Sequence, residues 1–192
     1  YAYSANPAGC PLYRADDRIE QSGRVKGTVR IGDRTIEFDG FGHRDHSWGT
    51  RDWVAFQNYR WCMAQAGENT SVHFWHLHAL GSTKVLGYVF KDGVMAEVTE
   101  VDFSWTHDEA FLQRSLDATL IDEEGRSTKL AIEFTAHYPL VPDPSVTLME
   151  GSGRAVIDGK QGVGWTEVAW PTEYLKHIRS VPIYKQEAGK DQ

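Results

Sequence analysis

The feature that most constrains the fold of this 192-residue chain is an apolar period of two, repeated in short runs between turn-forming residues. In the run 24–31, Val25, Val29 and Ile31 alternate with charged or polar neighbours, so an extended strand would have one dry and one wet face. The turn at 32–34 then leads into a second alternating run. No long helical period is present, and the pattern predicts an all-β protein.

About ten such runs follow one another along the chain: 24–31, 35–41, 58–66, 70–80, 84–91, 94–106, 112–122, 127–138, 145–157 and 161–170. An open sheet of this many strands would leave two exposed edges, and closure removes them. Short sequential connections favour an antiparallel up-and-down barrel of about 8–10 strands over a sandwich, which needs at least one long crossing. The proline-rich segment 138–144, expected as a loop, keeps the sandwich as an alternative.

The chain is long enough for one well-packed domain. We expect an N-terminal extension over 1–22, the barrel over 23–180 with a short helix over 171–177, and a polar tail over 181–192, frayed from about residue 185. Because the chain opens on Tyr1 in an aperiodic stretch, we also expect further chain upstream.

Composition excludes several classes of function. A formal charge of -7 argues against a nucleic-acid partner, which requires a cationic surface. No apolar run approaches the roughly 20 residues of a transmembrane helix. Cys10 and Cys62 have no metal-ligand spacing and are interpreted as reduced thiols of a cytoplasmic protein, with a single disulfide left open.

The segment 40–53, GFGHRDHSWGTRDW, differs from the rest of the chain in its density of Gly, His, Trp and Arg-Asp pairs. In an extended strand, His46 and Trp48 share one face with Arg44, while His43, Asp45 and Ser47 share the other. One hypothesis is an ion-pair network that locks a strand corner. The other is that the same charges orient His46 in a site, with Asp45 as its partner.

This segment resembles the signature G-x-G-x-R-D-H-S-W-G-x-R-D-W at the start of the second barrel of the carotenoid 1,2-hydratases (hydroxyneurosporene synthases). The resemblance covers about residues 20–180 and implies a lipocalin-like (calycin) barrel, one of two in tandem. Members of that family and their distant relatives, the tocopherol cyclases and fungal Diels-Alderases, act on apolar polyenes or prenyl chains without a cofactor. Their His-x-Trp element corresponds to His46 and Trp48, whereas their Tyr-x-Asp pair falls near His73 and Trp75, where this chain departs from the pattern.

The chain contains seven Trp, eight Tyr and eight Phe, a surplus of aromatic residues. One interpretation is that these rings fill the faces of a β-sheet. The other is that they line the walls of a ligand cavity. Indole faces stabilise a carbocation by roughly 0.5–2 kcal/mol each when desolvated. The expected substrate-binding residues are Trp48, Trp53, Tyr59, Trp61, Trp75 and Trp165.

The general acid should be a carboxyl group whose neutral form burial favours. Glu167 is the candidate, because it shares a strand face with Val163 and Trp165. The alternative is that Glu167 faces solvent while Val168 and Trp170 point inward.

A metal site is a further hypothesis, with His76 and His78 on one strand face and His43 or His46 as a third ligand. The chain lacks the glutamate that a cupin-like site places after the His-x-His, so we expect no metal and no cofactor.

The favoured function is therefore a cofactor-independent lyase or isomerase, hydratase- or cyclase-like, acting on a hydrophobic, isoprenoid or polycyclic substrate inside the barrel. His46, Asp45 and Glu167 are its expected catalytic residues, and a second lipocalin-like domain or subunit is its expected partner. The alternative is a non-catalytic carrier of an apolar metabolite.

Overall fold

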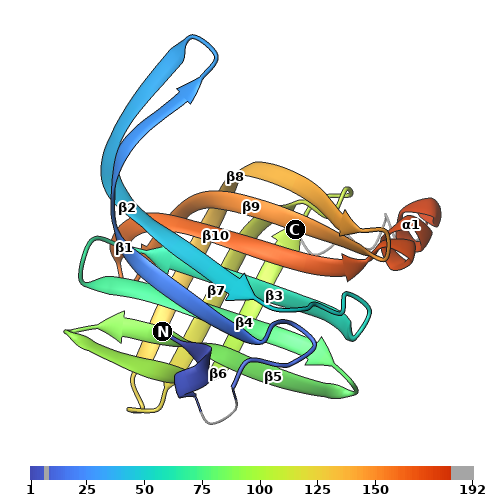
Figure 1. The fold of residues 1–192 in the computed structure, drawn as a ribbon, viewed down its shortest axis with the longest axis horizontal. Helices are drawn as coiled ribbons and strands as arrows, with labels where there is room; N and C mark the ends of the chain where they lie inside the picture. The colour runs from blue at the N-terminus through green and yellow to red at the C-terminus, as the bar shows by residue number, and fades with distance from the viewer. Residues whose placement is uncertain (7–8, 183–192) are drawn as a thin grey trace.

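The computed structural model describes residues 1–6 and 9–182 and is almost entirely antiparallel β structure (Figure 1). A 3-10 turn, η1 (Tyr3–Ala5), precedes ten strands, and a helix, α1 (Thr172–Ser180), follows them. The strands are β1 (Asp17–Ile31), β2 (Arg34–Trp48), β3 (Phe56–Gln65), β4 (Thr70–Ala79), β5 (Ser82–Lys91), β6 (Val94–His107), β7 (Gln113–Asp122), β8 (Ser127–Asp143), β9 (Val146–Ile157) and β10 (Lys160–Pro171).

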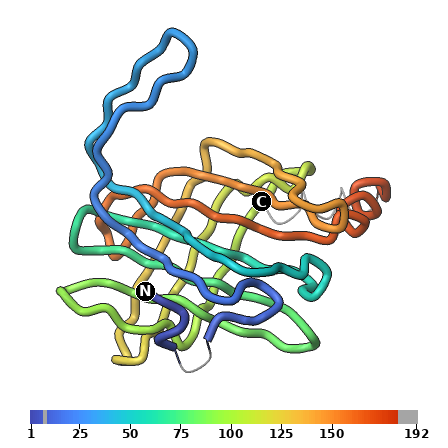
Figure 2. Tube along the Cα trace, viewed as in Figure 1, coloured from blue at the N-terminus to red at the C-terminus, as the bar shows by residue number. Residues whose placement is uncertain are grey.

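Strands β3 to β10 form a closed barrel in which each strand pairs with its sequence neighbours and β10 pairs with β3. This is the up-and-down barrel that the alternation predicts, and it has the lipocalin-like form that the family resemblance implies. β1 and β2 do not join it: they pair only with each other, over fifteen positions from Asp17↔Trp48 to Ile31↔Arg34. The hairpin crosses the outside of the barrel beside β3 and β10, and its tip projects beyond the barrel (Figures 1 and 2).

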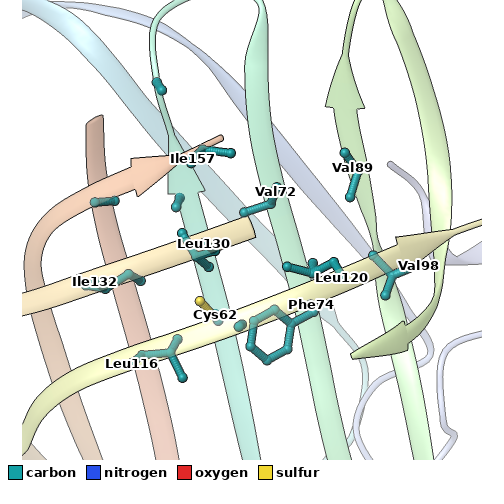
Figure 3. Packing of buried hydrophobic residues seen from close by; sticks show 14 of the residues in the cluster. Cys62, Val72, Phe74, Val89, Val98, Leu116, Leu120, Leu130, Ile132 and Ile157 are labelled. Atoms are coloured by element: carbon teal, nitrogen blue, oxygen red, sulfur yellow. The ribbon is translucent and has the colours of Figure 1, made fainter. Parts of the chain in front are cut away.

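The interior of the barrel is filled by side chains. Inward-facing apolar residues from most of the barrel strands pack into one buried cluster, which includes Cys62, Phe74, Leu120, Leu130 and Ile132 (Figure 3). The cavity inside the barrel, next to Cys62 and Phe74, has a volume of only about 10 Å³. That is room for about one water molecule. The expectation of a substrate inside the barrel is therefore wrong, because the inward faces meet at the barrel axis.

A second apolar layer covers part of the outside of the barrel. Tyr3, from the N-terminal segment, packs with outward-facing residues of β3 and β4, among them Tyr59, Trp61, Trp75 and Leu77. Both faces of β3 and β4 are thus covered, and most of their residues are buried. Part of the aromatic surplus of the chain therefore lies in this layer between the barrel and the N-terminal segment.

Several boundaries differ from those expected. The expected boundary at residue 23 falls within β1, because the hairpin strands continue to Asp17 and Trp48. The expected proline-rich loop 138–144 is wrong, since β8 runs on to Asp143 and pairs with β9.

At the C-terminal end, α1 begins directly after Pro171, close to the expected helix, and the expected frayed tail lies outside the described residues. Within residues 1–6 and 9–182, no helix is long and apolar enough to cross a membrane.

Candidate active site

A pocket of about 640 Å³ lies between the β1–β2 hairpin and the outer face of the barrel. It is lined from β2 by His43 and Asp45, and from the barrel strands by apolar and charged side chains. The barrel residues in this lining include Trp61, Met63, Glu150, Val163, Trp165 and Glu167. The alternation of β10 explains this lining: Thr166 and Val168 point into the barrel, so Val163, Trp165 and Glu167 point out.

Glu150 and Glu167 are directly opposite each other in the β9–β10 register. The phenol of Tyr59 donates a hydrogen bond to Glu167, and the indole Nε1 of Trp165 donates one to Glu150 Oε2 at 2.6 Å. The two carboxyl groups also share a hydrogen bond. Two carboxyl groups this close cannot both be ionised easily, because their negative charges would repel each other.

Burial, together with the charge of Glu167, raises the pKa of Glu150 to about 8. The hydrogen bond to Glu167 acts in the same direction, because a protonated Glu150 donates it. At pH 7 Glu150 is therefore predominantly a neutral carboxylic acid at the wall of the pocket.

Asp45 belongs to the hairpin wall of the pocket and is bonded to Arg18 Nη2. Burial raises the pKa of Asp45 to about 6, with further repulsion from Glu20 and Glu167, although Arg18 acts in the opposite direction. Its side chain remains 40% exposed, so the carboxylate is open to the pocket. At pH 7 Asp45 is mainly ionised, and the site therefore contains an acid and a base with separated pKa values.

Behind this wall, Glu20 is completely buried and fully hydrogen-bonded. It accepts bonds from Arg18 Nε at 2.5 Å, from the Trp61 indole at 2.9 Å and from His43 Nε2 at 2.7 Å. Burial opposes ionisation, but His73, the His43 hydrogen bond and Arg18 outweigh it and lower the pKa of Glu20 to about 2. Glu20 is thus a permanent anion that holds Arg18 and the hairpin against the barrel.

His73, on β4, closes this network from the barrel side. Its Nε2 lies 2.9 Å from the Tyr3 hydroxyl and 3.6 Å from Glu20 Oε1, and its Nδ1 lies 3.0 Å from the backbone oxygen of Cys62. Burial lowers the pKa of His73 to about 4, so the ring is neutral at pH 7. Glu20, His43 and His73 present three ligand-type atoms that all lie within 4.8 Å of one another.

The structure corrects the expected direction of His46 and Trp48. Both are on the exposed face of β2, where Trp48 is 44% exposed and His46 Nδ1 bonds Arg44 at 2.7 Å. Their rings contact each other edge to face, with centroids 5.5 Å apart, but they do not line the pocket. The opposite face of β2, with His43 and Asp45, is the one that meets the barrel.

The expected aromatic residues divide into two groups. Trp61 and Trp165 line the pocket. Tyr59 and Trp75 are buried in the outer apolar layer, and Tyr59 reaches the site only through its bond to Glu167. Trp53 packs at the edge of that layer, against the guanidinium groups of two arginines.

Each of the two sequence hypotheses describes part of the position of Glu167. It lines a pocket with Val163 and Trp165, while Val168 points inward, because the pocket is outside the barrel. Glu150 was missed, although it is the only acidic residue in the run 146–157 and could have been noticed for that reason.

The structure is similar to that of kievitone hydratase from Nectria haematococca, with a TM-score of 0.53 and 12% sequence identity. The match covers 88% of this chain and 58% of that chain, so this chain spans little more than half the length of that hydratase. At this identity the likeness establishes the shared fold. A comparison with curated proteins finds no match.

A family model described as "Domain of unknown function (DUF7064)" matches residues 1–172 and so includes the hairpin, the barrel and every residue of the pocket. The lipocalin-like barrel with an outer hairpin is thus contained within the matched region. The chain belongs to the DUF7064 family.

Proposed function

We propose that the chain is a hydratase-like lyase that adds water to, or removes it from, a hydrophobic substrate held between the β1–β2 hairpin and the barrel. The single observation that carries this proposal is the pair of carboxyl groups with separated pKa values in one pocket: Glu150 at about 8 and Asp45 at about 6. General acid–base catalysis requires a proton donor and a proton acceptor that are both in the correct form at the working pH.

In the hydration direction, Glu150 donates its proton to one carbon of the double bond, and a carbocation forms at the other carbon. Water attacks that carbon and transfers a proton to Asp45, so that one C–H and one C–O bond replace the π bond. The charge of Glu167 and the hydrogen bond between the two carboxyl groups favour the protonated form of Glu150 in the resting state. Proton exchange with solvent then resets both groups.

The pocket walls suit a substrate of this kind. Trp61, Met63, Val163 and Trp165 supply apolar and aromatic surface. An indole face near the reacting carbon stabilises positive charge, by roughly 0.5–2 kcal/mol when desolvated. The proposal assigns no proton transfer to His46, whose ring is on the exposed face of β2.

The relatives support the class of reaction and leave the substrate as part of the proposal. The shared fold with a protein named as a hydratase agrees with addition or removal of water. The motif resemblance to carotenoid hydratases suggests an isoprenoid alkene as the substrate class. Because the pocket is on the outer face, a second domain or subunit could lie against it and complete its wall.

The test is incubation of the protein with a panel of isoprenoid alkenes in ¹⁸O-labelled water, with mass spectrometry of the products. We expect an alcohol that carries one ¹⁸O and a bell-shaped pH dependence, with an optimum between the pKa values of Asp45 and Glu150. Glu150→Gln and Asp45→Asn should each lose turnover by about 100-fold or more. Glu173→Gln, on the exposed surface of α1, is the control and should retain it.

Binding of the same alkenes is followed by quenching of tryptophan fluorescence. Binding without any labelled alcohol would contradict the enzyme and support a carrier. Turnover that survives both carboxyl substitutions would also contradict the proposed roles of Glu150 and Asp45.

A further inference from the structure

Three potential ligand atoms converge behind the pocket from three different strands. Glu20 comes from β1, His43 from β2 and His73 from β4, and their ligand-type atoms all lie within 4.8 Å of one another. Two imidazoles and one carboxylate are a ligand set that holds zinc in proteins. The three side chains also belong to the buried hydrogen-bonded network described above, and the proposed hydration uses none of them.

The hydrogen bonds of His73 decide which of its nitrogens has the lone pair that a metal ion requires. Its Nδ1 lies 3.0 Å from the carbonyl oxygen of Cys62, which can only accept, so Nδ1 carries the proton. The Nε2 atom therefore has a lone pair, which accepts a hydrogen bond from the Tyr3 hydroxyl at 2.9 Å and lies 3.6 Å from Glu20 Oε1. A metal ion between these two acceptors would be attracted by both, and it would replace the Tyr3 hydroxyl at Nε2. A metal-binding histidine typically has this arrangement, with its outer N–H bonded to a carbonyl.

His43 can present a lone pair in the same direction if the metal ion replaces the hydrogen bond between its Nε2 and Glu20. Its Nε2 lies 2.7 Å from Glu20 Oε2, and its Nδ1 lies 3.1 Å from Ser22 Oγ. A serine hydroxyl both donates and accepts. The proton of Nε2 can therefore be replaced by a metal ion while Nδ1–H donates to Ser22, whose hydroxyl is also within 2.8 Å of the Tyr88 hydroxyl.

The local charge also favours a cation. The Glu20 carboxylate in the cluster and the Asp45 carboxylate beside it share the Arg18 guanidinium, which bonds both of them. In a tetrahedral zinc site the ligand atoms are about 3.3 Å apart. The observed spread of up to 4.8 Å requires a contraction that small side-chain rotations can supply.

We propose that Glu20, His43 and His73 bind one Zn²⁺ ion, with a water molecule in the fourth position. The ion would join both strands of the hairpin to β4, because each ligand comes from a different strand. Since Glu20 and His73 have no exposed surface, the ion would be a structural tie that holds the hairpin wall of the pocket in place. This inference goes beyond the proposed hydration and does not depend on it.

The test measures metal binding directly. The protein is stripped with a chelator, titrated with Zn²⁺ by calorimetry at pH 7, and loaded with Co²⁺, whose intense visible d–d bands report tetrahedral coordination. We expect one Zn²⁺ per chain, tetrahedral Co²⁺ bands that Zn²⁺ abolishes, and a higher melting temperature with Zn²⁺ than with the chelator. His43→Ala and His73→Gln should each reduce Zn²⁺ affinity by more than about 100-fold.

Two matched controls come from the same strands as the ligands. His46→Ala on β2 and His78→Ala on β4 remove partly or fully exposed imidazoles and should leave the affinity unchanged. Circular dichroism establishes that each variant is folded, and His43→Ala still decides the result if His73→Gln does not fold.

Failure of the wild-type protein to bind a stoichiometric Zn²⁺ ion would overturn the proposal. So would equal affinity in wild type and His43→Ala, or loss of binding in His46→Ala or His78→Ala. Because these readouts do not involve turnover, they are independent of any failure of the proposed hydratase activity.

Discussion

Replacing Glu150 by glutamine should change how the stability of the protein depends on pH. In the folded chain, burial and the charge of Glu167 raise the pKa of Glu150 to about 8, whereas in the unfolded chain its value returns to about 4.5. The folded state therefore holds this proton more tightly. The resulting stability is fully present below pH 4.5 and is lost as the pH rises through about 8.

The size of the effect follows from the difference between the two pKa values. At about 1.4 kcal/mol per pKa unit, the rise from 4.5 to about 8 corresponds to at most about 5 kcal/mol. Because the pocket is open to solvent, screening reduces this figure, and we expect about 1–2 kcal/mol. The amide of glutamine cannot ionise but can still donate a hydrogen bond to Glu167, so Glu150→Gln removes the titration and keeps the contact.

The assay is urea unfolding at pH 5, 7 and 9 for the wild type, Glu150→Gln and the exposed control Glu173→Gln. The wild type and the control should lose the stated 1–2 kcal/mol between pH 5 and 9 relative to Glu150→Gln, which should be the most stable of the three at pH 9. If all three proteins show parallel pH profiles, Glu150 is not held protonated in the folded state and the argument for its role as an acid fails.

Three further substitutions test the fold, each by urea unfolding at pH 7. Gly153→Ala would place a methyl group 1.9 Å from a backbone oxygen of β8 and should lower the free energy of unfolding by about 3 kcal/mol or more. In the control Gly23→Ala, the methyl group meets nothing within 4 Å, and the free energy of unfolding should change by less than about 0.5 kcal/mol. Equal effects of the two substitutions would contradict the close approach at Gly153. Leu130→Ala, in the filled interior, should cost about 2–5 kcal/mol, and a smaller loss would indicate a looser core. Trp61→Phe removes the indole donor to buried Glu20 and should cost about 1.5–3 kcal/mol, so an unchanged midpoint would show that this bond is dispensable.

The strands of this protein could be predicted well from its sequence because the signals are local. Alternation in runs such as 84–91 and 145–157, with glycine turns between them, indicates ten strands and their order, and short connections favour pairing between neighbours. The same local rule placed Glu167, Val163 and Trp165 on one face of β10, and the pocket contains all three.

Alternation could not show which face of each strand would be covered. On β2 it separates His46 and Trp48 from His43 and Asp45, but the choice between the two faces depends on contacts with β3, a strand that comes later in the chain. The conspicuous His-x-Trp pair is exposed, while the less conspicuous His43 contacts Trp61, with ring centroids 5.5 Å apart. Likewise, Glu150 becomes a candidate acid only because the register places it opposite Glu167.

The sequence by itself therefore determined the all-β class, the number and order of the strands and the two faces of each one, because a period of two is written into neighbouring residues. Only the tertiary structure decided that the barrel interior is filled and that the first two strands lie outside the barrel. It also decided that the pocket lies between those two strands and the barrel. The physical reason is that closure brings together side chains distant in sequence. The desolvation and mutual repulsion that set the pKa values of Glu150 and Asp45 exist only once those side chains meet.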